Sequence, residues 1–330
     1  MRYSRNRTRV NEFQLIRHFF TRQSLQRADV AVGIGDDAAV LEVAADQQLV
    51  TSTDTLNAGI HFPLDTEASA IGHKCLAVNL SDLAAMGATP AWFTLHLSLP
   101  QVDPTWIDAF CRGMFTLADE YGVQLVGGDT TRGPLTITVT AQGLVPRGQA
   151  LLRRGARAGD LVYVTGQLGD AGVGLLQHAG TLQLPEAERA QVLRRLHLPT
   201  PRVREGQTLR GMATSCIDVS DGLAADLGHV LAASGVGARL DLACIPLSAV
   251  YRRCLPQLGW EVALTHGDDY ELCFTLPVAQ QGALQQVAAR FSCGVTRIGE
   301  IQAQPGLRMV DETGKEFHAR AAGYDHFRGS

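Results

Sequence analysis

The sequence predicts an α+β protein built from two consecutive domains. Strand-like and helix-like segments alternate along the chain, and its 330 residues exceed the roughly 250–300 that one core commonly organises. The alternation also restarts after a polar, glycine-rich and basic stretch at 146–160. We therefore expect a first domain over 12–150 and a second over 151–330, preceded by a basic disordered tail over 1–11.

Apolar spacing defines the elements expected in the first domain. Helical spacing and flanking Pro or Gly residues predict helices over 12–20, 66–87 and 104–122. Alternating or short apolar runs predict strands in 29–43 around a glycine turn, then over 47–56, 91–99, 123–134 and 135–145. Two glycines inside the run at 123–134 predict a turn that breaks this strand.

The second domain repeats the mixture of strands and helices. A strand in 160–166 leads into a glycine-rich turn that opens a helix, and a charged helix is expected near 185–197. A strand, a turn and a helix follow over 215–235, and further strands are expected in 237–247 and 269–277. We detect no short-period repeat.

Composition excludes several classes of protein. The net charge of −4 gives no reason to expect nucleic acid or an anionic membrane as the main partner. No apolar run approaches the roughly 18 residues of a membrane span, and the Arg-rich start lacks the apolar core of a secretory signal. Seven cysteines without a CxxC pair indicate neither zinc nor disulfides, so we expect a cytoplasmic protein with reduced thiols.

Aspartates are the feature of the sequence that points to chemistry. Seven of them lie at strand ends, in turns or against an apolar helix, with few cations nearby: Asp36, Asp37, Asp54, Asp82, Asp129, Asp218 and Asp221. Asp82 is the sharpest case, because it interrupts an apolar run that reads "AVNLSDLAAMGA". A carboxylate buried without a partner is costly or gives up its charge.

A hard divalent cation would reconcile converging aspartates. Mg²⁺ prefers oxygen ligands, and Ser52, Thr53 and Thr130 add hydroxyl oxygens beside the aspartates. Histidines and thiols are absent from these clusters, which disfavours zinc. The alternative for each single residue is local hydrogen bonding, and Asp218, Ser220 or Asp221 would then cap the helix that follows them.

Two glycine-rich stretches offer phosphate sites. The stretch at 166–174 follows a strand and opens a helix, but it lacks the P-loop motif and the strict dinucleotide motif. The stretch at 126–134 adds Arg132, whose guanidinium group suits a phosphate. For the first stretch, the competing interpretation is a plain turn that opens the helix. Arg153 lies at the domain boundary, where it either contacts phosphate or is a solvated charge of the linker. His61 follows Asp54 in a loop, where it has either a structural role or a contact with substrate.

Aspartates, hydroxyls and glycine turns together favour Mg²⁺-dependent phosphoryl transfer from a nucleotide. In this chemistry the protein mainly positions the reactants and neutralises charge. No residue stands out as a general base, which fits direct in-line transfer to an acceptor phosphate that is already ionised.

At these residues the chain resembles the thiamine-monophosphate kinase family over about 12–328. The segments that carry the resemblance, in the family's order, read "GIGDDAAVL", "TSTDTLNAGIHF", "KCLAVNLSDLAAMGATPAW", "GGDTTRGPL", "IDVSDGLAADLGH", "DYELCFT" and "GYDHF". The resemblance implies the two-domain fold of aminoimidazole ribonucleotide synthetase-like enzymes, a homodimer joined through the N-terminal sheets, and an ATP site between the domains. It also implies ATP and thiamine monophosphate as substrates.

The resemblance assigns roles residue by residue. It implies Mg²⁺ ligands at Asp37, Ser52, Thr53, Asp54, Asp82, Asp129, Asp218 and Asp221, ATP contacts at Gly128, Asp129, Arg153 and Ser220, and substrate contacts at His61, Asp268 and Ala321. Two of these positions depart from the family pattern. Asp268 stands where relatives commonly have a longer Glu, and Ala321 stands where they often have an aromatic residue that stacks on the thiamine rings.

Four other functions compete with this interpretation. Selenophosphate synthetase and the hydrogenase-maturation relative of the same fold each need a terminal cysteine that this chain lacks. An aminoimidazole ribonucleotide synthetase-like enzyme fits the fold, although the segments around Asp54 and Asp268 favour the kinase. The last competitor is a regulatory module that binds ATP and Mg²⁺ without turnover.

Overall fold

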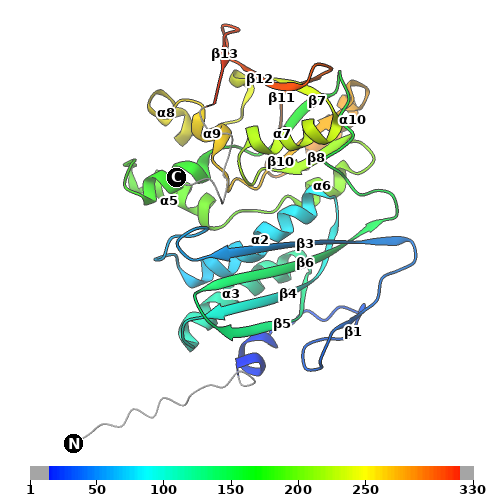
Figure 1. Cartoon of the computed structure of the whole chain (residues 1–330), viewed down its shortest axis with the longest axis vertical. Coiled ribbons are helices and arrows are strands. Elements are labelled where there is room, and N and C mark those ends of the chain that lie inside the picture. Colours follow the sequence, from blue (N-terminus) through cyan, green and yellow to red (C-terminus); the bar gives the residue numbers. More distant parts are fainter. Residues whose placement is uncertain (1–14, 320–330) are drawn as a thin grey trace, which may run out of the picture.

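The computed structural model describes residues 15–319 as two α+β units stacked along the long axis of the molecule (Figure 1). A four-stranded sheet forms the first unit and a seven-stranded sheet the second. The predicted domain limit near 150 falls on the connection between the two sheets, and the exact limits stay a prediction. The predicted tail at 1–11 lies outside the described residues.

The first unit contains two long helices beside the four-stranded sheet. Its elements are η1 (Ile16–Phe20), β1 (Val30–Val32), β2 (Val40–Leu41), β3 (Gln47–Asn57), α2 (Ala68–Ala85), β4 (Thr89–Leu99), α3 (Pro104–Tyr121), β5 (Gln124–Arg132) and β6 (Thr136–Pro146). The helices predicted over 66–87 and 104–122 are confirmed as α2 and α3. The helix predicted over 12–20 is described from residue 15 on, where η1 is a single π-helical segment.

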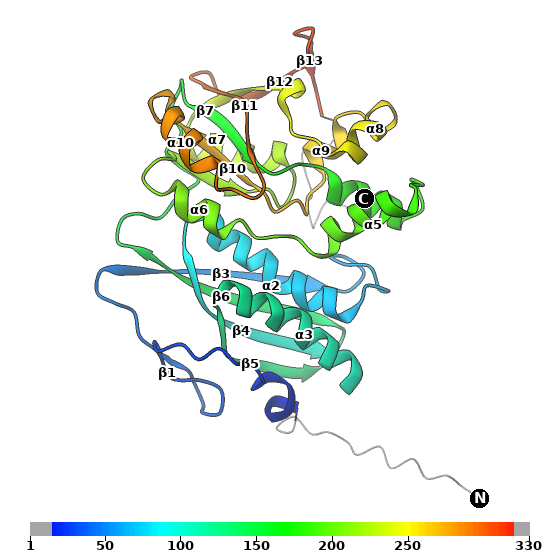
Figure 2. The same ribbon diagram turned by 180° about the vertical axis from the view of Figure 1, so that it is seen from behind.

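Strand order places two strands of the first sheet at its edges. The order is β3-β6-β4-β5, with β4 and β5 parallel and the other neighbours antiparallel. Helices α2 and α3 pack against each other on one face of this sheet, as Figure 2 shows from behind. Strands β3 and β5 therefore each have one side without a partner strand in this sheet.

The predicted break in the strand at 123–134 is wrong. Strand β5 runs through both glycines, and its pairing with β4 shifts register beside them. Gly128 has φ +145°, and a Cβ atom there would lie 1.8 Å from the Leu95 carbonyl oxygen. The glycine therefore allows close contact between two backbones instead of a turn.

The second unit surrounds a longer, mostly antiparallel sheet. Its elements are β7 (Leu161–Thr165), α4 (Asp170–His178), α5 (Glu186–His197), α6 (Val203–Leu209), β8 (Ser215–Asp218), α7 (Leu223–Ser234), β9 (Gly237–Asp241), η2 (Leu242–Cys244), α8 (Ala249–Leu258), α9 (Glu261–Thr265), β10 (Leu272–Leu276), η3 (Val278–Gln280), α10 (Gln281–Ala288), β11 (Val295–Gln302), β12 (Gly306–Val310) and β13 (Glu316–Phe317). The sheet order is β13-β12-β9-β11-β7-β10-β8.

Helix α2 is the element that joins the two units. It packs on β3 and α3 in the first unit and on α6 and β8 in the second. This double contact explains its sequence, because a helix buried on nearly all sides is apolar on nearly all sides. Any charged residue on α2 therefore lies between the two sheets or inside the core.

All seven cysteines are free, and five of them are buried. Over residues 15–319, no helix has both the length and the apolar character that crossing a membrane requires.

Candidate active site

A cavity of about 850 Å³ lies at the junction of the two units, beside α2. The elements that line it are β3 and the loop after it, α2, α4, the loop after β8, and the segment from the end of α9 to β10. Eight of the predicted site residues line it: Thr53, Asp54, His61, Asp82, Asp218, Ser220, Asp221 and Asp268. The fold thus gathers residues that are more than 200 positions apart in the sequence.

Asp54 and Asp82 face each other across β3 and α2. Burial, followed by the negative charge of Asp82, raises the pKa of Asp54 to about 7. Burial also raises the pKa of Asp82, although a hydrogen bond from the Ser52 hydroxyl opposes this effect. The Asn79 side chain on α2 accepts a hydrogen bond from the Asp54 backbone N–H at 3.2 Å, which adds a second polar contact between α2 and β3. The metal-free site therefore retains protons near neutral pH.

The loop after β8 presents the second pair of predicted ligands. The Ser81 hydroxyl on α2 donates to Asp218 Oδ2 at 2.7 Å, and burial raises the pKa of Asp218 well above its ordinary value. The backbone N–H groups of Ser220 and Asp221 donate to Asp226 Oδ2, each at 3.0 Å. Sequence inspection missed Asp226, although an Asp in the first turn of a helix is a known signal for such a contact.

The capping alternative for this loop is wrong. Gly222 is the N-cap of α7, so none of Asp218, Ser220 and Asp221 occupies the capping position. Asp218 and Asp221 line the cavity instead. Their position is therefore consistent with a binding role.

The predicted substrate contacts lie on opposite walls of the cavity. On one wall, the Asn57 backbone N–H donates to His61 Nδ1 at 3.0 Å, which leaves the ring proton of neutral His61 on Nε2. On the other wall, Asp268 has φ +68° and accepts a hydrogen bond from the Tyr270 hydroxyl at 3.0 Å. Lys74 on α2 lies between them, a buried cation that the sequence signalled in the same way as Asp82 but that we assigned no role.

Three predicted residues lie elsewhere. Asp37, Gly128 and Asp129 line a second cavity of about 820 Å³, between η1, the loop before β2 and the β4–β5 edge. Asp54 and Asp129 lie on the two edge strands of one sheet, so three strand spacings, about 14 Å, separate their backbones. One ion cannot bind both residues of the same chain, because Mg²⁺–oxygen distances are about 2 Å.

Two further predicted residues need separate mention. Arg153 is exposed, and its positive charge lowers the pKa of Asp82, so it lies within electrostatic range of the first cavity. Ala321 lies outside the described residues.

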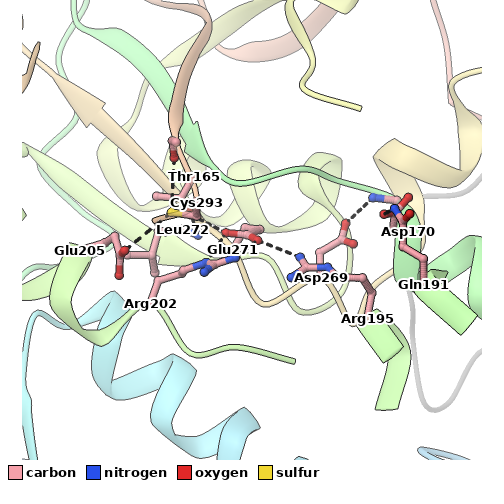
Figure 3. A network of polar contacts seen from close by, with 12 residues as sticks. Thr165, Asp170, Gln191, Arg195, Arg202, Glu205, Asp269, Glu271, Leu272 and Cys293 are labelled. Atoms are coloured by element: carbon pink, nitrogen blue, oxygen red, sulfur yellow. Dashed lines mark hydrogen bonds and ion pairs between the residues drawn. The ribbon is translucent and has the colours of Figure 1, made fainter. Parts of the chain in front are cut away.

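Carboxylate side chains of the protein itself contact the glycine-rich turn at 166–174 (Figure 3). The Gly169 N–H donates to Asp269 Oδ2 at 2.8 Å, and a Cβ atom on Gly166 would lie 2.1 Å from Glu271 Oε1. These contacts support the plain-turn interpretation. Glu271 in turn binds Arg202 through two hydrogen bonds of 2.6 and 2.5 Å.

The donor set of the first cavity fits Mg²⁺ in type. The predicted ligands supply only carboxylate and hydroxyl oxygens, and burial together with the nearby charge of Asp82 raises the pKa values of Asp54 and Asp218. In residues 15–319, no group of three or more His, Cys, Asp or Glu side chains already has an arrangement that could hold a metal ion. Residues 15–319 thus offer ligands of a suitable type in an incomplete arrangement.

Family models assign the class of protein. The model "AIR synthase related protein, N-terminal domain" matches residues 35–145, and the corresponding C-terminal domain model matches residues 157–312. The predicted two-domain α+β fold of aminoimidazole ribonucleotide synthetase-like enzymes is confirmed. Fold and site together define an AIR synthase related protein with a carboxylate-rich site beside α2.

Comparison with individual relatives identifies the family within this class. A thiamine-monophosphate kinase of Escherichia coli (strain K12) is 48% identical over 319 residues, which cover 96% of this chain and 98% of the relative. The crystal structure of thiamine-monophosphate kinase from Stenotrophomonas maltophilia K279a is also 48% identical, with a TM-score of 0.83 over 89% of this chain and 95% of that one. The structure of "AaThiL complexed with AMPPCP and TMP" is 30% identical, with a TM-score of 0.76 over 96% and 97% of the two chains. The chain belongs to the thiamine-monophosphate kinase family.

Proposed function

We propose that this chain transfers the γ-phosphoryl group of ATP directly to thiamine monophosphate, giving thiamine diphosphate and ADP. The bond between the γ-phosphorus and its bridging oxygen breaks as an acceptor phosphate oxygen bonds to that phosphorus. The acceptor is already ionised, so the reaction needs no general base. The observation that carries the proposal is the aspartate-lined cavity of a chain that is 48% identical to thiamine-monophosphate kinases.

We propose Mg²⁺ as the cofactor, on the basis of its oxygen donors. The ligands would be Asp37, Ser52, Thr53, Asp54, Asp82, Asp129, Asp218 and Asp221. When bound, Mg²⁺ neutralises charge on the phosphates of ATP. The chain itself holds these carboxylates in place through Ser52, Ser81 and Asp226.

The two substrates would use the remaining predicted residues. We propose that Gly128, Asp129, Arg153 and Ser220 bind ATP and that His61 and Asp268 bind thiamine monophosphate, with Ala321 near its rings. The 3.0 Å contact between Asn57 and His61 supports this role for His61, because it fixes the ring with a donor on Nε2. A donor at this position suits a phosphate oxygen.

We propose a homodimer in which each site takes residues from both subunits. Strands β3 and β5 are opposite edges of one sheet, and each has an unpaired side there. A two-fold arrangement that pairs β3 with β5 of the partner subunit would close an eight-stranded barrel. The partner's Asp129 would then lie near Asp54, which would resolve their separation within one chain.

Subunit complementation tests this dimer. Asp54→Asn and Asp129→Asn homodimers should each be inactive. In an equal mixture after subunit exchange, half of the dimers are mixed and each mixed dimer contains one intact site, so about a quarter of wild-type activity should return. If both variants are inactive and the mixture stays inactive although mixed dimers form, Asp129 does not complete the partner's site.

The reaction itself is tested with the purified full chain. Incubation with ATP, Mg²⁺ and thiamine monophosphate should give thiamine diphosphate and ADP in equal amounts, and a reaction without thiamine monophosphate is the control. ATP binding without product would favour the regulatory module, and ATP consumption without thiamine diphosphate would favour another enzyme of the same fold. The free thiols support a cytoplasmic location, which stays part of this proposal.

A further inference from the structure

Lys74 differs from the other cationic residues of the chain in its type and in its burial. Only two of the chain's 29 cationic residues are lysines, Lys74 and Lys315. The Lys74 side chain is 3% exposed, in the middle of the apolar helix α2, whereas Lys315 is exposed near the end of the second unit. The other cationic side chains of the chain, Lys315 apart, are arginines. Lys74 therefore stands out as a compact ammonium group that is buried in α2.

The Lys74 ammonium connects two segments that line the main cavity. Nζ lies 3.1 Å from Asp268 Oδ1 and donates to the His61 carbonyl oxygen at 3.2 Å. His61 follows β3 in the first unit, and Asp268 precedes β10 in the second. One side chain therefore bridges both walls of the cavity, a geometry that suits the three donors of an ammonium group.

A purely stabilising role does not account for this lysine. Exchanging a buried ion pair for apolar residues of similar volume is often neutral or favourable for stability. Ile71, Ala77 and Val78, one turn away from Lys74 on α2, are apolar and buried, so the charge finds its polar partners only outside the helix, at Asp268 and His61. The cost of burying the charge therefore points to a role in the cavity.

We propose that Lys74 is a positioning residue for the acceptor substrate, which fixes Asp268 relative to His61. The proposal rests on the proposed kinase function. Both described partners of the Asp268 side chain, Lys74 and the Tyr270 hydroxyl, bind Oδ1. Their contacts orient Oδ2 as the oxygen that remains for a ligand in the cavity.

The backbone around Asp268 supports this role. Its N–H donates to the Ser220 carbonyl oxygen at 2.9 Å, and the Tyr270 N–H donates to the Val219 carbonyl oxygen at 2.8 Å. Asp268 and Tyr270 also have positive φ values of 68° and 50°, an uncommon conformation that needs surrounding contacts to persist. Lys74 connects this loop to the first unit's wall through its contacts with Asp268 and His61.

Steady-state kinetics of the full-length Lys74→Met variant test the proposal, with Lys315→Met as the matched control. The KM for thiamine monophosphate should rise about tenfold or more in Lys74→Met, as expected for loss of one charged hydrogen bond. Its KM for ATP and the kinetics of Lys315→Met should stay within about twofold of wild type. Equal increases in both KM values, or a fall in kcat at unchanged KM, would contradict the positioning role.

A double-mutant cycle with Asp268→Asn provides the second test. If Lys74 acts through Asp268, the double variant should raise the KM for thiamine monophosphate by much less than the product of the two single effects. Multiplicative effects would show that Lys74 acts independently of Asp268. A wild-type protein that makes no thiamine diphosphate would refute the kinase function itself, and the two failures are thereby distinguished.

Discussion

Replacing Asp82 with Asn should abolish turnover and yet stabilise the metal-free protein. Asn has nearly the shape of Asp, and its oxygen still accepts the hydrogen bond from Ser52. The variant loses the negative charge that faces Asp54. If the carboxylates are kept for metal binding, removing one charge should relieve repulsion in the empty site.

The pKa of Asp54 sets the size and the pH range of this effect. Its pKa is 3.8 when unperturbed and about 7 in the fold, and a difference of about three units corresponds to about 4 kcal/mol. Below pH 3.8, Asp54 is protonated in both states and does not lower the free energy of unfolding. Between pH 3.8 and 7 that free energy falls, because Asp54 ionises only in the unfolded chain, and above pH 7 the loss is complete. Burial is the larger cause of the raised pKa, so we assign about 1–2 kcal/mol of this destabilisation to the negative charge of Asp82.

Thermal unfolding in EDTA measures this gain. Asp82→Asn should unfold roughly 1.5–3 °C above wild type at pH 8 and within about 1 °C of it at pH 4, where Asp54 keeps its proton in the folded state. Adding Mg²⁺ at pH 8 should raise the unfolding temperature of wild type and leave that of the variant nearly unchanged.

Two outcomes would refute this reasoning. A variant that is less stable than wild type at pH 8 in EDTA would show that repulsion between Asp54 and Asp82 is not the main effect. Equal stabilisation of both proteins by Mg²⁺, or residual kinase activity, would show that Asp82 is not a metal ligand.

Two further substitutions test the framework of the site. Glu271→Gln should destabilise the protein by about 3 kcal/mol in urea unfolding, because it removes the buried carboxylate that Arg202 and Arg195 share. Glu316→Gln, at an exposed pair, should have little effect. A loss no larger than that of the control would contradict the role of Glu271. Gly128→Ala should abolish ATP binding or folding, while Gly127→Ala, where a Cβ meets no atom within 4 Å, should do neither; equal behaviour of both would refute the close-contact explanation.

The sequence predicted helices and strands well where the apolar residues of a segment followed a single helical or strand spacing. Helices α2 and α3 and strands β3 and β6 match their expected ranges to within about two residues, because long apolar patterns specify them without help from distant residues. The prediction failed at Gly128, since glycines signal a turn or a close backbone contact equally well. Only the neighbouring strand decides between these interpretations.

The candidate site was predictable in residue type but not in arrangement. Asp82 attracted attention because a charge in an apolar helix needs a partner, and the same signal was present at Lys74. The partner of Lys74 is Asp268, which is 194 positions away, and no local pattern encodes such a contact. Asp129 shows the same limit, because only strand order reveals its separation from Asp54.

Proton release and subunit pairing should therefore be linked to cation binding. Asp54 retains its proton up to about pH 7, so a cation that binds there must displace it, and apparent Mg²⁺ affinity should fall up to tenfold per pH unit below 7. If the partner's Asp129 completes the site, Mg²⁺ with ATP should also tighten the dimer by linkage. Sedimentation velocity of dilute protein at pH 6 and pH 8, with and without both ligands, measures this effect. A dimer population that does not respond to ligand at pH 8 would mean that each subunit binds its ligands alone.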